Sequence, residues 1–183
     1  MPLTFEPDDL VARCIACLGE DQPRTAIREV LEATMQQRAE VADVLRPERG
    51  GLTFLHSSPE LTVIDVVWAP GMRLYPHDHR MWACIAVYSG LEDNEFFRRD
   101  GAHLQPANGR RIEDGDVLLL GDDTVHAVAN PGTKPTGAIH VYGGDFIKQP
   151  RSQWRPPENV EEPFDMRNLN DEFASANRAW LGD

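Results

Sequence analysis

The sequence predicts a mainly β protein, an antiparallel sandwich or barrel, with a helical segment in front of it. Two patterns support this fold class. From residue 52 onward, short apolar segments alternate with turns rich in Gly, Pro, Asn and Asp, which is typical of antiparallel β domains. The first 48 residues instead carry apolar side chains at helical spacing. A chain of 183 residues is long enough for one domain with a sizeable core.

The N-terminal segment, residues 1–48, is predicted to form helices that pack on the barrel. DDLVARCIACLGE begins with acidic residues suited to a helix N-terminus, and it places Leu10, Cys14 and Cys17 at helical spacing. PRTAIREVLEATMQQRAEVADVLR then continues with an apolar stripe that includes Ile27. A redox Cys-x-x-Cys follows a strand, so Cys14 and Cys17 are expected to be buried helix residues.

The barrel is predicted over residues 49–150. Its strands are expected in LTFLH, LTVIDVVW, WACIAVYSG, EFFRR, DVLLLG, AVAN and GAIHVYG, with turns such as APG, GLEDN and NPGTKP between them. Residues 151–183 form a C-terminal extension that is rich in Pro and acidic residues. Its end, DEFASANRAWLGD, is predicted to be a short helix or a loose tail.

Composition narrows the class of function. Hydrophobic residues make up 41% of the chain, which is ordinary for a globular protein. The net charge of −12 argues against nucleic acid and anionic membranes as partners, because both need a basic face. No apolar run approaches the roughly 20 residues of a membrane span, and the N-terminus lacks the features of a signal peptide. Three cysteines are too few for a disulfide scaffold, so a cytoplasmic location is expected.

Three histidines form the strongest candidate site. His77 and His79 are separated by one residue, and in a strand they would project to the same side while Asp78 faces away. Two imidazoles that converge in this way are suited to a divalent metal ion. A third histidine, His126, lies 47 residues after His79 in GDVLLLGDDTVHAVAN. The alternative is that His77 and His79 are surface residues on an edge strand, which leaves His126 unexplained.

The spacing around these histidines resembles the two signature motifs of the cupin superfamily, G-x5-H-x-H-x3,4-E-x6-G and G-x5-P-x-G-x2-H-x3-N. The first motif matches from Gly71 through the histidine pair, with Cys84 in the glutamate position and Gly90 one residue early. The second motif matches in spacing from Gly115 through His126, although the proline and glycine positions differ. The resemblance implies an all-β cupin fold, a double-stranded β-helix or jelly-roll barrel with an N-terminal helical segment.

The cysteine in the glutamate position suggests the chemistry. A metal held by three neutral imidazoles keeps its full charge and can accept an anionic ligand such as a thiolate. This arrangement resembles the cysteine dioxygenase and thiol dioxygenase family, which binds a small thiol to Fe(II) beside O2 and produces a sulfinic acid. The resemblance implies His77, His79 and His126 as ligands of Fe(II). Zn, Ni or Mn would also fit in a purified sample.

Further positions match that family. Trp68 stands nine residues before the first histidine, as a tryptophan does in that family. The stretch HVY supplies His140 and Tyr142, which match the family's His-x-Tyr pair. The resemblance implies that His140 orients Tyr142, and that Cys84 forms a thioether with this tyrosine. Cys84 is out of phase with the histidine pair on a regular strand, so the crosslink requires a bulge. The alternative is that Cys84 is a small core residue. The family's serine is Ala138 here.

The arginine that holds the substrate carboxylate in this family has no counterpart at the matching place, Gly51. Its absence argues against L-cysteine as the substrate. Tyr75 and Trp82 are expected to be pocket walls or core residues, and His56 could take the place of the missing arginine. The acidic stretch after Gly90 is expected to serve the turn and to supply no ligand. This stretch contains Glu92, Asp93 and Asn94.

The sequence therefore predicts a mononuclear non-haem Fe(II) dioxygenase that acts on a small thiol. The alternatives are a three-histidine cupin dioxygenase that cleaves a carbon substrate such as a diketone, and a cupin that binds a metal or small ligand without turnover. Small thiol and O2 are the expected partners. A homodimer through edge strands is a family expectation.

Overall fold

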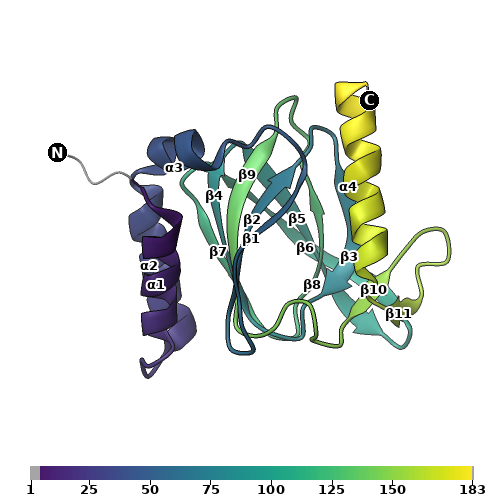
Figure 1. Ribbon diagram of the computed structural model, residues 1–183. Coiled ribbons are helices and arrows are strands. Elements are labelled where there is room, and N and C mark those ends of the chain that lie inside the picture. The colour runs from purple at the N-terminus through teal and green to yellow at the C-terminus, as the bar shows by residue number, and fades with distance from the viewer. Residues whose placement is uncertain (1–4, 183) are drawn as a thin grey trace.

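The protein is built from two antiparallel sheets that face each other. The computed structural model describes residues 5–182. The first sheet has the strand order β1 (Gly51–Ser57), β2 (Thr62–Trp68), β9 (Thr136–Tyr142), β4 (Ala83–Ser89) and β7 (Val117–Leu120). The second has the order β11 (Glu161–Pro163), β10 (Ser152–Trp154), β3 (Arg73–Asp78), β8 (Val125–Ala129), β5 (Leu91–Asp100) and β6 (His103–Glu113). The predicted all-β barrel with an N-terminal helical segment is confirmed (Figure 1).

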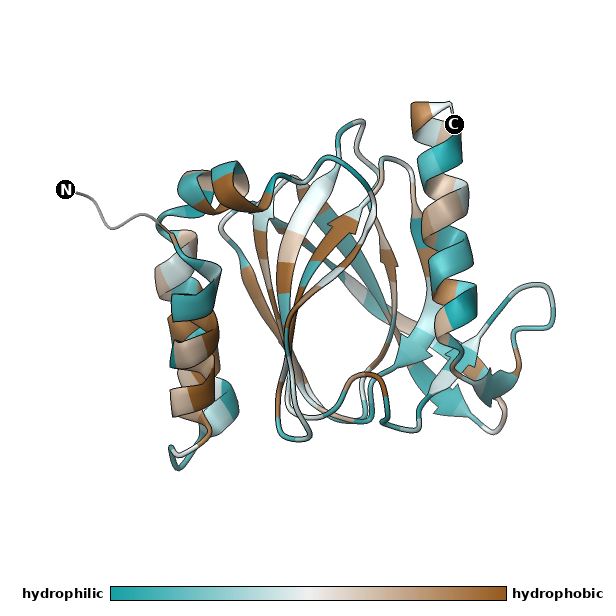
Figure 2. Ribbon diagram, viewed as in Figure 1, coloured by the Kyte–Doolittle hydropathy of each residue, from teal (hydrophilic) through white to brown (hydrophobic). Residues whose placement is uncertain are grey.

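Three helices precede the barrel: α1 (Pro7–Cys17), α2 (Pro23–Met35) and α3 (Arg38–Leu45). The first two begin with proline, which lacks the N–H group that a first helical residue would leave unpaired. They lie beside the outer face of the five-stranded sheet (Figure 2), and their buried apolar side chains form one cluster with side chains of that sheet. Cys14 and Cys17 are buried helix residues with free thiols, as the sequence predicts.

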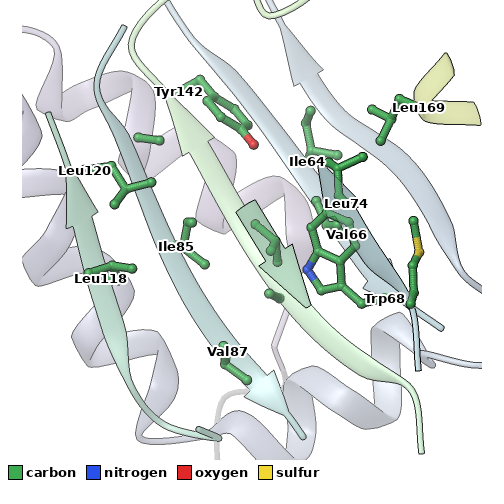
Figure 3. Close-up of a cluster of buried hydrophobic side chains, with 14 of the residues drawn as sticks. Ile64, Val66, Trp68, Leu74, Ile85, Val87, Leu118, Leu120, Tyr142 and Leu169 are labelled. Atoms are coloured by element: carbon green, nitrogen blue, oxygen red, sulfur yellow. The ribbon is translucent and has the colours of Figure 1, made fainter. Parts of the chain in front are cut away.

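Strand alternation divides the core of the protein into two parts. Along β4, Ala83, Ile85 and Val87 face the barrel interior. Cys84 and Ala86, between them, face the helices on the other side of the sheet. Figure 3 shows side chains of the interior cluster on one side of the sheet, with Tyr142 and Trp68 among them. Because these strands are covered on both faces, β2, β4 and β9 are buried along almost their whole length and are largely apolar.

The C-terminal extension is ordered and closes one side of the barrel. It adds β10 and β11 to the second sheet and ends in α4 (Met166–Leu181), which lies on the side away from the N-terminal helices (Figure 1). Asp165 caps this helix by accepting a hydrogen bond from the N–H group of Arg167 (2.9 Å). Phe173 of α4 stacks on Trp68 with ring centroids 5.4 Å apart. Within residues 5–182, no helix combines the length and the apolar character that a membrane crossing needs.

Candidate metal centre

The structure brings His77, His79 and His126 together inside the barrel. His77 on β3 lies directly opposite His126 on β8, and His79 follows just after β3 ends. All three side chains are buried, and their ligand nitrogens lie within 4.8 Å of one another. Two neighbouring strands and the residue that follows one of them thus direct three histidine side chains to one point.

Asp78 anchors the segment that carries the first two histidines. Its side chain is fully buried and points away from them, as the strand pattern predicts. One carboxylate oxygen accepts a hydrogen bond from the N–H group of Ser152 (2.7 Å), and the other pairs with Arg99 and with Arg80 Nε (2.6 Å). Arg80 adopts a left-handed backbone conformation, with φ of 53°. The ion pair holds this turn, which redirects the chain immediately after His79.

The protonation of the three histidines suits metal binding. Burial lowers the pKa of His77 to about 4, and it lowers the pKa values of His79 and His126 well below the usual range. The imidazoles are therefore neutral near pH 7. His77 Nδ1 donates to the Tyr75 carbonyl (3.1 Å), which leaves Nε2 free to act as a ligand. His126 Nε2 is buried without a hydrogen-bond partner among the described residues. The cluster therefore fits a divalent metal ion.

Tyr142 and His140 lie beside the cluster, as expected. The Tyr142 hydroxyl is 3.0 Å from His140 Nδ1, and its ring makes an edge contact with His79 at a centroid distance of 4.9 Å. Burial raises the pKa of Tyr142, so the phenol remains protonated at neutral pH. A hydroxyl group next to the histidines can thus provide a hydrogen bond to a bound ligand.

Cys84 does not reach the site, so the prediction of a Cys84–Tyr142 thioether is wrong. The register of β4 with β9 is regular here: Ala83 pairs with Tyr142, and Cys84 pairs with Val141. No bulge turns Cys84 inward, so it lies among the side chains that face the helices. Burial raises its pKa to about 12, which leaves an unreactive thiol.

Sequence reasoning missed a buried acidic network behind the histidines. Glu92 and Asn94 lie on β5, not in a turn, and both are buried. Glu92 accepts hydrogen bonds from Trp68 Nε1 (2.8 Å) and from the Asn94 amide (2.9 Å), and Asn94 Oδ1 lies 2.7 Å from His126 Nδ1. Strand alternation could have predicted this network, because residues 92 and 94 point to the same face of a strand. That strand, β5, pairs with β8, which carries His126.

The cavity beside the histidines is small and mostly apolar. Its volume is about 20 Å³, which is room for about one water molecule. Its walls come from both sheets and from the C-terminal extension. They include Leu52, Val66, Trp68, Leu74, Val128, His140, Tyr142, Phe146, Phe164 and Leu169.

Tyr75 and Trp82 pack in or against the core, which is one of the two places that the sequence predicts for them, whereas the prediction that His56 reaches the pocket is wrong. Tyr75 is buried but contributes its backbone carbonyl to His77 and does not line the cavity. Trp82 precedes the inward-facing Ala83, so it points outward and packs against Gly143, where a Cβ atom would come within 2.1 Å of its ring. His56 is half-buried on β1 and does not line the cavity.

Arg151 provides a buried positive charge next to the cavity. It is 7% exposed, and its guanidinium stacks between Phe146 and Phe164 at 4.1 Å from each ring centroid. It donates to the Phe146 carbonyl, and within residues 5–182 no carboxylate forms an ion pair with it. Burial lowers its pKa to about 10. Its positive charge helps to lower the pKa of His77 and offsets part of the rise in the pKa of Tyr142, so its field reaches the site.

Comparison with known proteins supports the fold. No known family profile matches the chain. A protein from Bacillus halodurans superposes with a TM-score of 0.51 at 17% identity, covering 71% of this chain and 90% of that one. A cupin family protein with a double-stranded β-helix fold from Methanocaldococcus jannaschii gives a TM-score of 0.46 at 10% identity, covering 55% of this chain and 85% of that one. Oxalate decarboxylase from Bacillus subtilis gives 0.41 at 24% identity over 48% of this chain and only 22% of its own length.

These similarities concern the fold alone. Several of the solved structures that resemble the chain are described as cupin or double-stranded β-helix proteins. The two facing antiparallel sheets form a jelly-roll barrel with a fold of the cupin type, and a buried cluster of three histidines lies inside it. In this barrel the residue in the glutamate position is Cys84, which faces away from the cluster.

Proposed function

We propose that the protein is a mononuclear non-haem Fe(II) dioxygenase that adds O2 to the sulfur of a small thiol and yields a sulfinic acid. The observation that carries the proposal is a cluster of three neutral imidazoles, with no carboxylate in the cluster, beside a protonated tyrosine. His77, His79 and His126 would hold the metal. A bound Fe(II) ion would supply a place where thiol and O2 are held side by side, so that their reaction becomes intramolecular.

Tyr142 and His140 have separate roles in this proposal. The Tyr142 ring contacts His79, and its hydroxyl, which bonds to His140 Nδ1 in the ligand-free protein, can turn its single hydrogen toward an anionic ligand instead. His140 orients the hydroxyl through its Nδ1 atom. The remaining walls are largely apolar and exclude water from the reacting groups.

The substrate class follows from the size and charge of the pocket. A cavity of about 20 Å³ favours a ligand of a few heavy atoms, and Phe146 and Phe164 must shift to admit it. Arg151 stands directly behind these two rings without a carboxylate partner among the described residues. A small thiol that bears a carboxylate or another anionic group would supply that partner.

The decisive experiment is anaerobic reconstitution with Fe(II), followed by O2 uptake and sulfinate detection with a panel of thiols. Carboxylate-bearing thiols should give the largest kcat/KM. Arg151→Gln should raise KM for these thiols and leave KM for a neutral thiol of the same length nearly unchanged. Tyr142→Phe is expected to retain the iron and to lower kcat, because the ring remains and only the hydroxyl is lost.

Other outcomes identify the rival functions. O2 uptake with diketones and not with thiols would support a dioxygenase that cleaves carbon–carbon bonds. Metal binding without uptake on any substrate would support a cupin that binds a metal or small ligand without turnover. The cytoplasmic location and the homodimer expected from the sequence remain predictions, and light scattering of the purified protein measures the latter.

A further inference from the structure

Glu92 is a buried carboxylate that the proposed reaction does not use directly. It is fully buried on β5 and is not a member of the histidine cluster. Each of its oxygens accepts one hydrogen bond, Oε2 from Trp68 Nε1 and Oε1 from the Asn94 amide. Oε2 also lies 3.6 Å from His140 Nε2. Glu92 is thus connected to His126 of the histidine cluster through Asn94, and it lies close to His140.

The hydrogen bonds of Glu92 determine which nitrogen of His126 carries the proton. Since a carboxylate only accepts, Asn94 must turn its NH2 group toward Glu92 and its oxygen toward His126. His126 Nδ1 then has to carry the hydrogen in the 2.7 Å contact. The lone pair of the neutral ring is left on Nε2, the buried atom without a hydrogen-bond partner among residues 5–182.

The same carboxylate acts on His140. A negative oxygen 3.6 Å from Nε2 favours the ring form that carries its hydrogen on that nitrogen. Nδ1 is then the acceptor for the Tyr142 hydroxyl, at 3.0 Å. In this chain Ala138 stands two residues before His140 and cannot hydrogen-bond to the ring, so the orienting group comes from a different strand.

We propose that Glu92 is a positioning residue that sets the tautomers of two imidazoles at once, those of His126 through Asn94 and of His140 directly. The proposal deepens the proposed function, because it rests on His126 being a metal ligand. One buried carboxylate thereby points a lone pair at the metal centre and arranges the tyrosine hydroxyl beside it.

Glu92→Gln tests the proposal without changing the size of the side chain. Trp68 can only donate, so it retains the oxygen of the new amide, and the new NH2 group faces Asn94. Asn94 must then turn over and present its own NH2 group to His126 Nδ1. The hydrogen of His126 moves to Nε2, the ligand lone pair is lost, and affinity for Co(II) or Zn should fall about 10–100-fold.

A second substitution should restore the site. In the double variant Glu92→Gln with Asn94→Asp, the new amide donates to the new carboxylate, and this carboxylate accepts from His126 Nδ1. Net charge and side-chain volume match the wild type, while the order of amide and acid is exchanged. Metal affinity should recover most of the loss. Glu95→Gln, on the same strand but exposed and paired with Arg73, is the matched control and should bind metal like the wild type.

The readouts are Co(II) and Zn affinity and long-range ¹⁵N–¹H NMR spectra of the metal-free protein, which report the protonated nitrogen of each histidine. Wild type should show hydrogen on Nδ1 of His126 and on Nε2 of His140. Hydrogen on the other nitrogen of either ring overturns the proposal, even if the single variant folds poorly. Unchanged metal affinity in folded Glu92→Gln, or no recovery in the double variant, also overturns it. A wild-type protein that binds metal but oxidises no thiol would refute the proposed function and leave this inference standing.

Discussion

Cys84 shows how one step of strand phase decides the role of a residue. It occupies the glutamate position of a cupin motif, yet the regular β4–β9 register turns it toward the N-terminal helices. We expect the tryptic peptides of Cys84 and Tyr142 to separate with unaltered masses after aerobic turnover. Cys84→Ala should leave metal affinity unchanged and lower the free energy of unfolding by about 1–2 kcal/mol through lost packing. A peptide pair lighter by two hydrogens would contradict this placement.

The buried carboxyl group of Asp65 should make the stability of the fold depend on pH. It lies on β2, and its carboxylate accepts a hydrogen bond from the Tyr88 hydroxyl (2.8 Å). Burial raises its pKa from 3.8 to about 6. Between these values the folded protein holds a proton that the unfolded chain has released. The contribution of Asp65 to stability therefore falls as pH rises from about 4 to about 6, by up to about 3 kcal/mol.

Asp65→Asn removes this titration and retains an acceptor for Tyr88. Thermal unfolding should show the variant more stable than wild type at pH 7, with the difference shrinking toward pH 4. The buried histidines, whose pKa values are lowered, oppose this trend in both proteins and cancel in the comparison. The reverse pH dependence of the difference would refute the assignment.

At the scale of elements, one buried polar side chain ties α4 to the start of the barrel. Asn177 accepts from the N–H group of Gly50 (2.9 Å) and donates to its carbonyl (2.8 Å). Both backbone groups lie in a buried contact, so Asn177→Ala leaves two polar groups without partners. We expect a loss of about 1–3 kcal/mol in the free energy of unfolding, measured in urea. Asn170→Ala, at an exposed position of the same helix, should change stability by less than about 0.5 kcal/mol.

The C-terminal elements also help to close the cavity beside the histidines. Phe164 and Leu169 line it, and Phe173 covers Trp68 from outside. A short helix was one of the two structures that the sequence predicts for the end of this segment, but the place where it docks could not be predicted. That place depends on a contact between residues 127 positions apart, Gly50 and Asn177.

At the scale of the whole molecule, metal binding should stabilise the fold, because the cluster joins β3 to β8 and exists only when the two strands are paired. A metal ion at about 100 times its Kd adds about 2.7 kcal/mol. For a chain of this size, that corresponds to a rise in Tm of about 5–10 °C. Chelation should lower the Tm of wild type by this amount and leave the Tm of His126→Ala unchanged. An equal effect of chelator on both proteins would place the metal elsewhere.

The sequence by itself determined the fold class, the helical N-terminal segment and the three histidines that meet in the barrel. The fold class and the helical segment follow from apolar periodicity and turn residues, and the pairing of His77 with His79 follows from the spacing of side chains along one strand. The addition of His126 follows from the resemblance to the two cupin motifs. Only the tertiary structure decided that Cys84 faces away, that Glu92 and Asn94 stand behind His126, and that Arg151 lies next to the cavity. Each of these depends on the register between strands, or on the docking of a distant segment. Such long-range contacts arise from packing the whole chain, and no spacing within one segment encodes them.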